Sequence, residues 1–233
     1  HLLSRRQRQM CIRDRRYRLS FTVGGLLALQ GKILATLFVE NEHEYTTSDV
    51  ESTNGTTAID HEIGERITRI RKQAIEGNVL SIRTRSANSR VVSEVLKRLS
   101  ALTETEIHYL ADDDTPASDR QALMWVAMCR YYALVGEFAN EVLRERYLMG
   151  FSTLNKDDYD RFIQAKSMWH PELEELSALT AGKLRSNVFK AMSEAELWEK
   201  ESDTLLPSLL SKSVTAILEN RPESFRFFPT RER

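Results

Sequence analysis

The segment that most constrains the fold of this chain is 119–149, DRQALMWVAMCRYYALVGEFANEVLRERYLM, which contains no proline and a single glycine. Within it, residues 122–135 carry one charged side chain, that of Arg130. A helix that is apolar on all sides is normally buried among other helices. At ~1.5 Å per residue this helix would extend roughly 45 Å. We therefore predict an all-α fold, a multi-helix bundle built around one long central helix.

Helical periodicity and capping residues predict more helices on both sides of this segment. The sequence TETE at 103–106 is a capping box, and Asn155 precedes two aspartates that suit the start of a helix. Polar stretches at 40–58 and 112–116 indicate loops. Helices are expected at about 24–38, 60–76, 86–100, 103–112, 155–169, 180–192 and 208–219.

The loops divide the chain into a helical domain at 16–114, the central helix at 115–150 and a second helical domain at 151–233. Residues 1–15 have neither helical periodicity nor capping residues. They could be a basic arm that orders on nucleic acid. We interpret them instead as a non-native or disordered arm and leave them out of the functional argument.

The charge of the chain gives no general support to nucleic-acid binding. The net charge is −1, and seven of the arginines lie within residues 1–18. An interface for nucleic acid would therefore have to rest on local basic patches.

Several other classes of protein fit the sequence poorly. The apolar segment 21–39 contains Gln30 and Lys32, so we expect a core helix and no membrane insertion. Two cysteines argue against a disulfide scaffold and fit a reducing cytoplasm. The glycine patterns of nucleotide sites and the HExxH and GxSxG motifs are absent from the sequence. We expect no enzyme activity and no cofactor.

The best candidate for a functional site is the basic segment 62–98, which carries nine Lys or Arg and four Glu. Arginine offers forked donors to phosphate oxygens, and the start of a helix at Ser86 or Asn88 would add free N–H groups. The pattern of helix, tight turn and helix also outlines a helix-turn-helix-like subdomain. The alternative is a solvated helical face. The candidate residues are Arg83, Arg85, Ser86, Ser89, Arg90, Lys97 and Arg98.

A second basic pattern lies at 183–190, where Lys183, Arg185 and Lys190 share a predicted helix with apolar Leu184 and Val188. This pattern resembles a recognition helix, but it also fits any amphipathic helix, and the amphipathic-helix interpretation is favoured.

Arg130 is predicted to have a structural role. A charge inside an apolar run needs a carboxylate partner, which we expect on another helix, as a structural ion pair.

Several segments in this order and spacing resemble the BrxA family, accessory proteins of BREX bacteriophage-defence systems. The resemblance extends over about residues 16–229. The segments that carry it are YRLSFT at 17–22, VLSIRTRS at 79–86 with Ser89 and Arg90, LMW at 123–125, CRY at 129–131, EFA at 137–139, KSMWHPEL at 166–173 and Phe228-Pro229.

This resemblance implies an all-helical, NusB-like fold and a non-enzymatic, DNA-binding role in phage defence. It places the family's basic motif on Arg83, Arg85, Ser86, Ser89 and Arg90. The partners that it implies are double-stranded DNA and other defence-system proteins. The alternative is a protein–protein scaffold subunit of the defence complex that does not itself bind nucleic acid.

Overall fold

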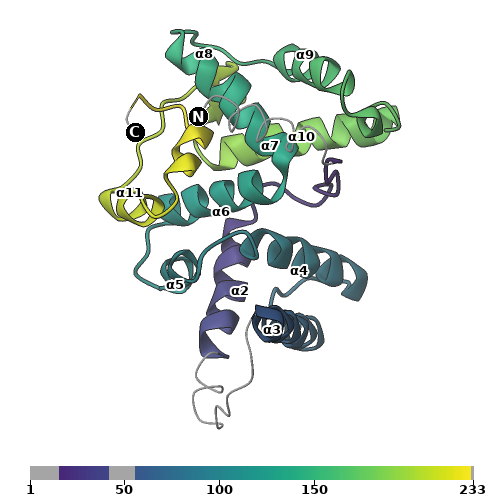
Figure 1. Cartoon of the computed structure of the whole chain (residues 1–233), viewed down its shortest axis with the longest axis vertical. Helices are drawn as coiled ribbons and strands as arrows, with labels where there is room; N and C mark the ends of the chain where they lie inside the picture. The colour runs from purple at the N-terminus through teal and green to yellow at the C-terminus, as the bar shows by residue number, and fades with distance from the viewer. Residues whose placement is uncertain (1–15, 42–55, 232–233) are drawn as a thin grey trace. The chain divides into compact units, whose positions relative to one another are not determined.

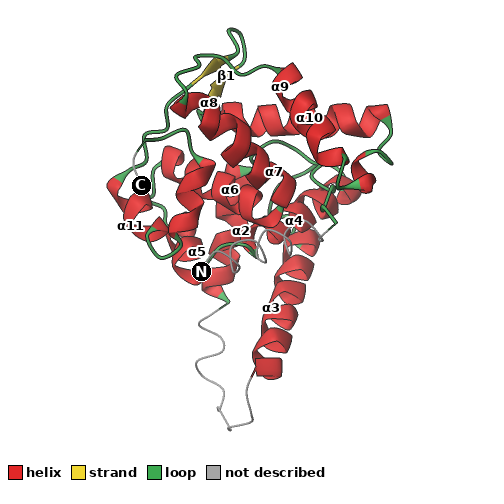
Figure 2. Cartoon of the chain, turned by 45° about the horizontal axis from the view of Figure 1, so that its top comes forward, coloured by secondary structure: helices red, strands yellow, loops and turns green. Residues whose placement is uncertain are grey.

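The computed structural model of the chain describes residues 16–41 and 56–231, and within α3 it describes side chains from residue 66 onward. The predicted arm at 1–15 and most of the predicted loop at 40–58 lie outside these residues. Figure 2 shows that the regular secondary structure of the described residues is almost entirely helical, which confirms the all-α prediction. The one sheet found among the described residues pairs β1 (Trp198–Glu199) with β2 (Thr204–Leu205), antiparallel.

The described residues form two compact units, each assembled from separate parts of the sequence. The α2–α6 unit comprises residues 26–131 and 210–221. The α7–α10 unit comprises residues up to 25, 132–209 and 222 onward. The boundary at 131–132 lies inside the segment that was predicted as a single helix. The units therefore do not coincide with the predicted domains 16–114, 115–150 and 151–233.

The α2–α6 unit packs its helices around a core of mostly apolar side chains. Helix α2 contacts α3, α4, α5 and α6, and α11 contacts α6. Gly31 permits the close approach of α2 to α6, since a Cβ there would lie 2.5 Å from the sulfur of Met124. The helices are α2 (Ala28–Glu40), α3 (Thr56–Glu76), α4 (Arg85–Leu99), α5 (Glu104–Ala111), α6 (Ala117–Tyr131) and α11 (Lys212–Leu218). Fully buried core side chains include Leu34, Ile70, Val92, Val95, Leu99, Leu110, Met124 and Trp125.

The predicted central helix is not continuous. Helix α6 ends at Tyr131, and Tyr132 has an extended backbone with φ −105° and ψ 96°. The ring of Tyr132 is fully buried and packs edge-on against Phe21 at 4.9 Å between ring centroids, and its hydroxyl lies 3.3 Å from that of Ser20. Packing of this side chain thus takes precedence over the helical propensity of the segment. The prediction of one helix across 119–149 is corrected to four shorter elements.

The α7–α10 unit is built around an aromatic cluster. Phe138 packs against Tyr159 and Phe162, while Phe189 packs against Trp198, with ring centroids 4.8–5.4 Å apart. Such edge-to-face pairs stabilise a core beyond their buried area. The elements are α7 (Ala133–Phe138), the π-helical η1 (Ala139–Arg144), α8 (Glu145–Leu148), α9 (Lys156–Ser167), the 3₁₀ turns η2 (Pro171–Leu173) and η3 (Pro222–Phe227), and α10 (Ala178–Glu194).

Local sequence signals set most helix ends correctly. The capping box of Thr103 and Glu106 and the cap of Asn155 on α9 are both confirmed. Helix α2, however, starts four residues later than predicted, after Leu27 adopts a left-handed conformation with φ 60°. The sequence SEAE at 193–196 does not begin a helix, because α10 continues through Glu194.

The three tryptophans differ in their burial. Trp125 and Trp198 are buried, but Trp169 is 60% exposed beside Met168. Helix α9 ends at Ser167, ahead of Pro171, and leaves Trp169 on the turn that follows the helix. Among the described helices, none combines the length and the apolar run needed to cross a membrane.

The N-terminal segment 16–25 is held on the α7–α10 unit by a buried carboxylate. Oε1 of Glu172 accepts a hydrogen bond from the backbone N–H of Tyr17 at 2.6 Å and lies 3.2 Å from Nδ1 of His170. The rings of Tyr17 and His170 stack at 3.9 Å. Burial by itself would raise the pKa of Glu172, but the hydrogen bonds from Tyr17 and His170 outweigh burial and leave that pKa lowered.

We expect this contact to make the stability of the protein depend on acid pH. A carboxylate whose pKa is lower in the folded than in the unfolded state stabilises the fold above its unfolded pKa, here about 4.5, and stops doing so as the pH falls further. In urea titrations at several pH values, Glu172→Gln should lower the free energy of unfolding at pH 7. It should also flatten the loss of stability below about pH 4.5. If the stability of the variant falls below pH 4.5 as steeply as that of the parent protein, Glu172 does not anchor the segment.

Candidate nucleic-acid interface

The first basic region is a helical hairpin formed by the end of α3, a turn at 77–84 and the start of α4. The turn contains two residues with left-handed backbone, Asn78 (φ 44°) and Ser81 (φ 51°). The segment 79–84 is therefore an irregular turn. The side-chain amide of Asn88 donates to the carbonyl oxygen of Ile75 at 3.4 Å, and Arg71 Nε donates to Ser93 Oγ at 3.2 Å. These contacts fasten α4 to α3.

Helix α4 begins two residues after Arg83 and is capped by Thr84, whose hydroxyl accepts from the N–H of Ala87 at 3.3 Å. The sequence placed this start at Ser86 or Asn88, so the cap is corrected to Thr84. With Thr84 as the cap, the N–H groups of Arg85 and Ser86 belong to the first turn and point along the positive end of the helix dipole. Arg83 and Arg85 are both exposed. Two guanidinium groups thus flank a helix start that favours an anion.

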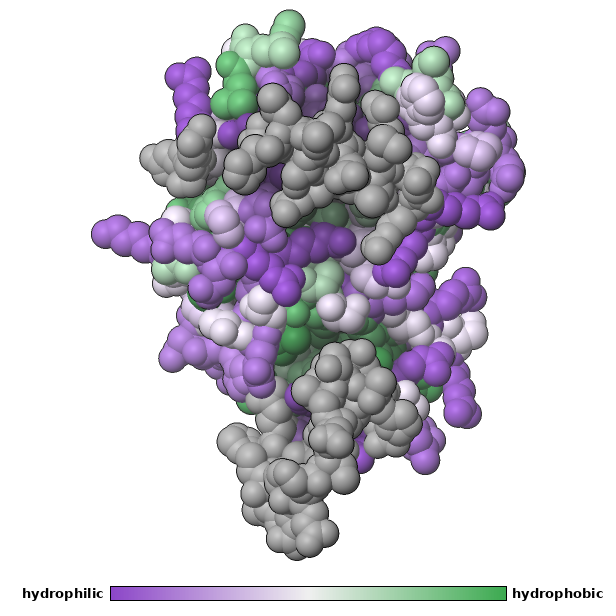
Figure 3. All heavy atoms as spheres, in the orientation of Figure 1, coloured by the Kyte–Doolittle hydropathy of each residue, from purple (hydrophilic) through white to green (hydrophobic). Residues whose placement is uncertain are grey.

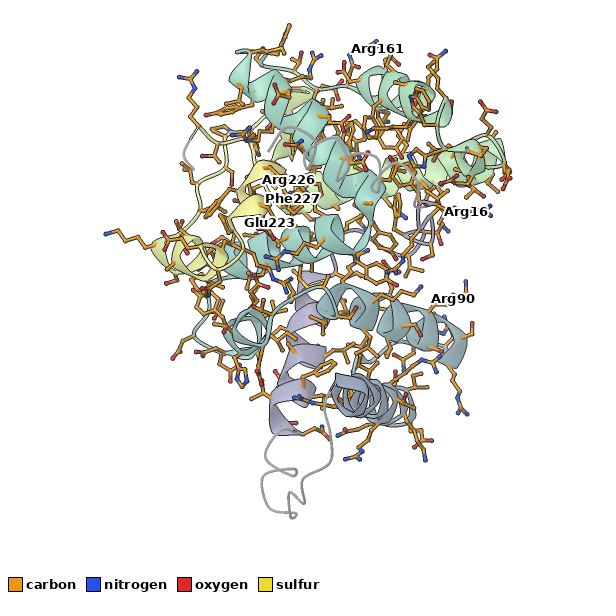
Figure 4. The ribbon with its side chains drawn as sticks, viewed as in Figure 1. Arg16, Arg90, Arg161, Glu223, Arg226 and Phe227 are labelled. Atoms are coloured by element: carbon orange, nitrogen blue, oxygen red, sulfur yellow. The ribbon has the colours of Figure 1, made fainter. Side chains whose placement is uncertain are left out.

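Three further predicted residues follow on the first turns of α4. Ser86 is exposed and accepts a hydrogen bond from Arg90 Nη2 at 3.3 Å, while Ser89 is half-buried. Figure 4 shows that Arg90 projects outward from α4. In Figure 3, hydrophilic side chains stand out from the region where Figure 1 places α3 and α4. Arg83, Arg85 and Arg90 are thus all exposed, and all three lie in the turn or in the first two turns of α4.

Lys97 and Arg98 do not belong to this cluster. Both lie in the last turn of α4, about 18 Å along the helix axis from Arg85. Arg98 is fully buried, where it binds Glu94 at 2.9 Å and donates to the carbonyl oxygen of Leu26 at 2.9 Å. A side chain with no exposed surface cannot contact DNA, so Arg98 is removed from the predicted interface. Lys97 is half-buried.

The second basic region, on α10, is largely committed to contacts inside its own unit. Arg185 is bound to Asp160, and Lys190 lies 3.7 Å from Glu194. Asn187 donates to the carbonyl oxygen of Phe21 at 2.9 Å. Lys183 is exposed near the start of the same helix. This pattern favours an amphipathic packing helix whose charges are mostly balanced. Because α10 and α4 belong to different units, we treat them as separate surfaces.

A hollow of about 470 Å³ beside the start of α4 was not predicted from the sequence. Its walls combine two apolar side chains, two arginines and several hydrogen-bonding groups. Asn78, whose backbone is left-handed, lies at the turn beside the hollow and is one of the residues that line it. The side chains that line the hollow are Ile75, Glu76, Asn78, Ile82, Arg83, Arg85 and Asn88.

Comparison with known proteins gives consistent matches. Residues 58–221 match the model of the BrxA family. The chain is 25% identical over 126 residues to the BREX protein BrxA of Bacillus cereus (strain H3081.97), which covers 54% of this chain and 62% of that protein. It is 23% identical over 124 residues to the BREX protein BrxA of Escherichia coli O9:H4 (strain HS), covering 53% and 57%. The matches thus span less than two thirds of these relatives.

The fold also has a counterpart among solved structures. The crystal structure of an uncharacterized protein from Magnetospirillum magneticum superposes with a TM-score of 0.70 at 19% identity, covering 92% of this chain and all of that one. At this level of identity the likeness concerns the fold alone.

Proposed function

This chain belongs to the BrxA family of BREX phage-defence systems, and from that premise we propose that it is a non-enzymatic accessory protein that binds double-stranded DNA in the cytoplasm. The observation that carries the proposal is the pair of exposed arginines, Arg83 and Arg85, at the start of α4. Guanidinium groups and helix N-termini both bind phosphate oxygens. Arg90, which is also exposed, lies on the second turn of the same helix.

Contacts of this kind read the DNA backbone and not its sequence. Phosphate contacts fix the position of a protein on the duplex but carry no sequence information. We therefore propose binding that is mostly independent of sequence, with other defence-system proteins supplying any choice of target. No step of this role needs a cofactor.

The proposal predicts a steep dependence of affinity on salt. If Arg83, Arg85 and Arg90 each neutralise one phosphate, the logarithm of the association constant should fall with the logarithm of the salt concentration with a slope of about −2.7. Between 50 and 200 mM salt the affinity should then fall about 40-fold. Fluorescence anisotropy with one labelled duplex, titrated at several salt concentrations, measures the slope. Affinity that is indifferent to salt would contradict the proposal.

A second candidate function is a protein–protein scaffold. The α7–α10 unit exposes large apolar side chains, among them Met149 at 69%, Phe151 at 51% and Trp169 at 60%. Exposed apolar groups of this size often mark protein contacts. Co-purification with defence-system proteins, with and without nuclease, separates the two functions. A complex that survives nuclease favours the scaffold, whereas a complex lost on nuclease treatment favours DNA binding.

A further inference from the structure

Asn88, one of the residues that line the hollow beside the start of α4, has a buried acceptor that lacks a donor. Asn88 is only 1% exposed, and its Nδ2 donates to the carbonyl oxygen of Ile75. That carbonyl fixes the orientation of the amide, because the opposite orientation would set two oxygens against each other. Oδ1 of Asn88 then receives no hydrogen bond from any group in the described part of the chain. Buried polar atoms are almost always paired, so this oxygen indicates a ligand that donates.

The other groups around the hollow match different parts of one ligand. Arg83 and Arg85 supply positive charge on its exposed side, where a phosphate would bind. The side chains of Ile75 and Ile82 supply apolar contact for a flat ring. The carboxylate of Glu76 repels phosphate but accepts hydrogen bonds, as does Asn88. The lining therefore favours a ligand with a phosphate, a ring and an amino group.

The volume of the hollow suits such a ligand. At about 470 Å³ it lies within the roughly 300–1,000 Å³ that small-molecule sites occupy. A nucleotide has the required phosphate and ring. Adenine and cytosine also carry an exocyclic amino group that donates, while thymine presents an oxygen and a methyl group in the equivalent place.

We propose that the hollow receives one unstacked adenine or cytosine of a DNA strand whose phosphates lie on Arg83 and Arg85. This inference rests on the proposed DNA-binding function and deepens it. The amino group of the base donates to Oδ1 of Asn88, and the ring lies against Ile82. Extruding a paired base costs a few kcal/mol. The site therefore favours DNA in which a base is already unpaired.

The experiment compares four short labelled duplexes that are identical apart from one position: fully paired, or with a single unpaired adenine, cytosine or thymine. We expect the unpaired adenine and cytosine duplexes to bind about tenfold more tightly than the paired one, since the paired duplex must first extrude a base at a cost of a few kcal/mol. The unpaired thymine duplex should bind about threefold to tenfold more weakly than adenine, because it lacks one hydrogen bond. This comparison changes only the DNA, so it does not depend on a variant that folds.

A protein variant locates the effect. Ile82 is half-exposed, so Ile82→Trp should fold, fill the hollow and abolish the preference for an unpaired adenine while leaving the salt slope unchanged. Leu80→Trp is the matched control, since Leu80 is a half-exposed residue of the same turn that does not line the hollow. The preference should survive in that control.

The outcomes separate this inference from the function on which it rests. Absence of binding to all four duplexes would overturn both. Equal binding to all four, or a preference that survives Ile82→Trp, would overturn the base site alone and leave DNA binding intact. The last measurement tests free deoxyadenosine monophosphate as a competitor of the labelled duplexes. If it bound as tightly as the unpaired adenine duplex, the hollow would be a site for a free nucleotide and the assignment to a DNA strand would be wrong.

Discussion

Reversing two charges at the start of α4, with Arg83→Glu and Arg85→Glu together, should weaken DNA binding by about 2–3 kcal/mol, or roughly 30- to 150-fold. A hydrogen bond to a charged group contributes about 1.5–3 kcal/mol, and we reduce the sum for two such bonds because both side chains are exposed and screened by salt. The salt slope should also become shallower by about 1.8, since two phosphate contacts are lost.

The control for this variant reverses the same amount of charge elsewhere in the same unit. Lys212 and Arg221 are exposed residues of the α11 region, outside the hairpin. Lys212→Glu with Arg221→Glu should change the affinity by less than the double variant at α4 and leave the salt slope nearly unaltered. Equal losses in the two variants would mean that overall charge, and not the hairpin, determines binding. Full affinity in the α4 variant would show that DNA binds elsewhere.

Much of the fold could be predicted because its signals are local. The caps at Thr103 and Asn155 depend on a side chain three residues from the backbone group that it binds, so the sequence alone contains both partners. The apolar spacing of α4 likewise marks its buried face. Tyr132 could not be predicted in this way, because its non-helical backbone accompanies packing against Phe21 and Ser20, which are distant in the sequence.

The candidate site was predictable in composition but not in geometry. Counting basic residues found Arg83 and Arg85, and it found Arg98 for the same reason. Only the structure shows that Arg98 is an internal ion pair with Glu94, four residues earlier on a buried face of α4. The hollow could not be found by counting at all. It depends on how Asn88 meets the last turn of α3.

The second large effect concerns stability. Arg130 makes a two-point contact with Glu106 of α5, with Nη1 2.6 Å from Oε2 and Nη2 2.9 Å from Oε1. The side chains are 9% and 1% exposed. This confirms the sequence-based expectation of a partner on another helix. Arg130→Met should lower the free energy of unfolding by about 3–5 kcal/mol, because it leaves a carboxylate buried without its cation.

The loss of stability in Arg130→Met should come from the unpaired charge of Glu106 and not from lost packing. A second substitution tests this. Glu106 also accepts the N–H of Thr103 at 2.7 Å as part of the capping box. Glu106→Gln removes the charge yet keeps an oxygen for that N–H. The double variant Arg130→Met with Glu106→Gln should therefore be more stable than Arg130→Met alone, by about 1–3 kcal/mol.

Urea unfolding of these two variants, with Arg221→Met as a matched exposed control, measures these differences. The control should change stability by no more than about 0.5 kcal/mol. The salt slope of DNA binding by folded Arg130→Met should match that of the parent protein, because Arg130 neutralises Glu106 and not a phosphate. If Arg130→Met lowers the free energy of unfolding by less than about 1 kcal/mol, the Arg130–Glu106 pair stabilises the protein no more than a solvent-screened surface ion pair does. A loss that Glu106→Gln does not relieve would mean that Arg130 stabilises the unit through its contact with the carbonyl oxygen of Ala101 and its packing instead.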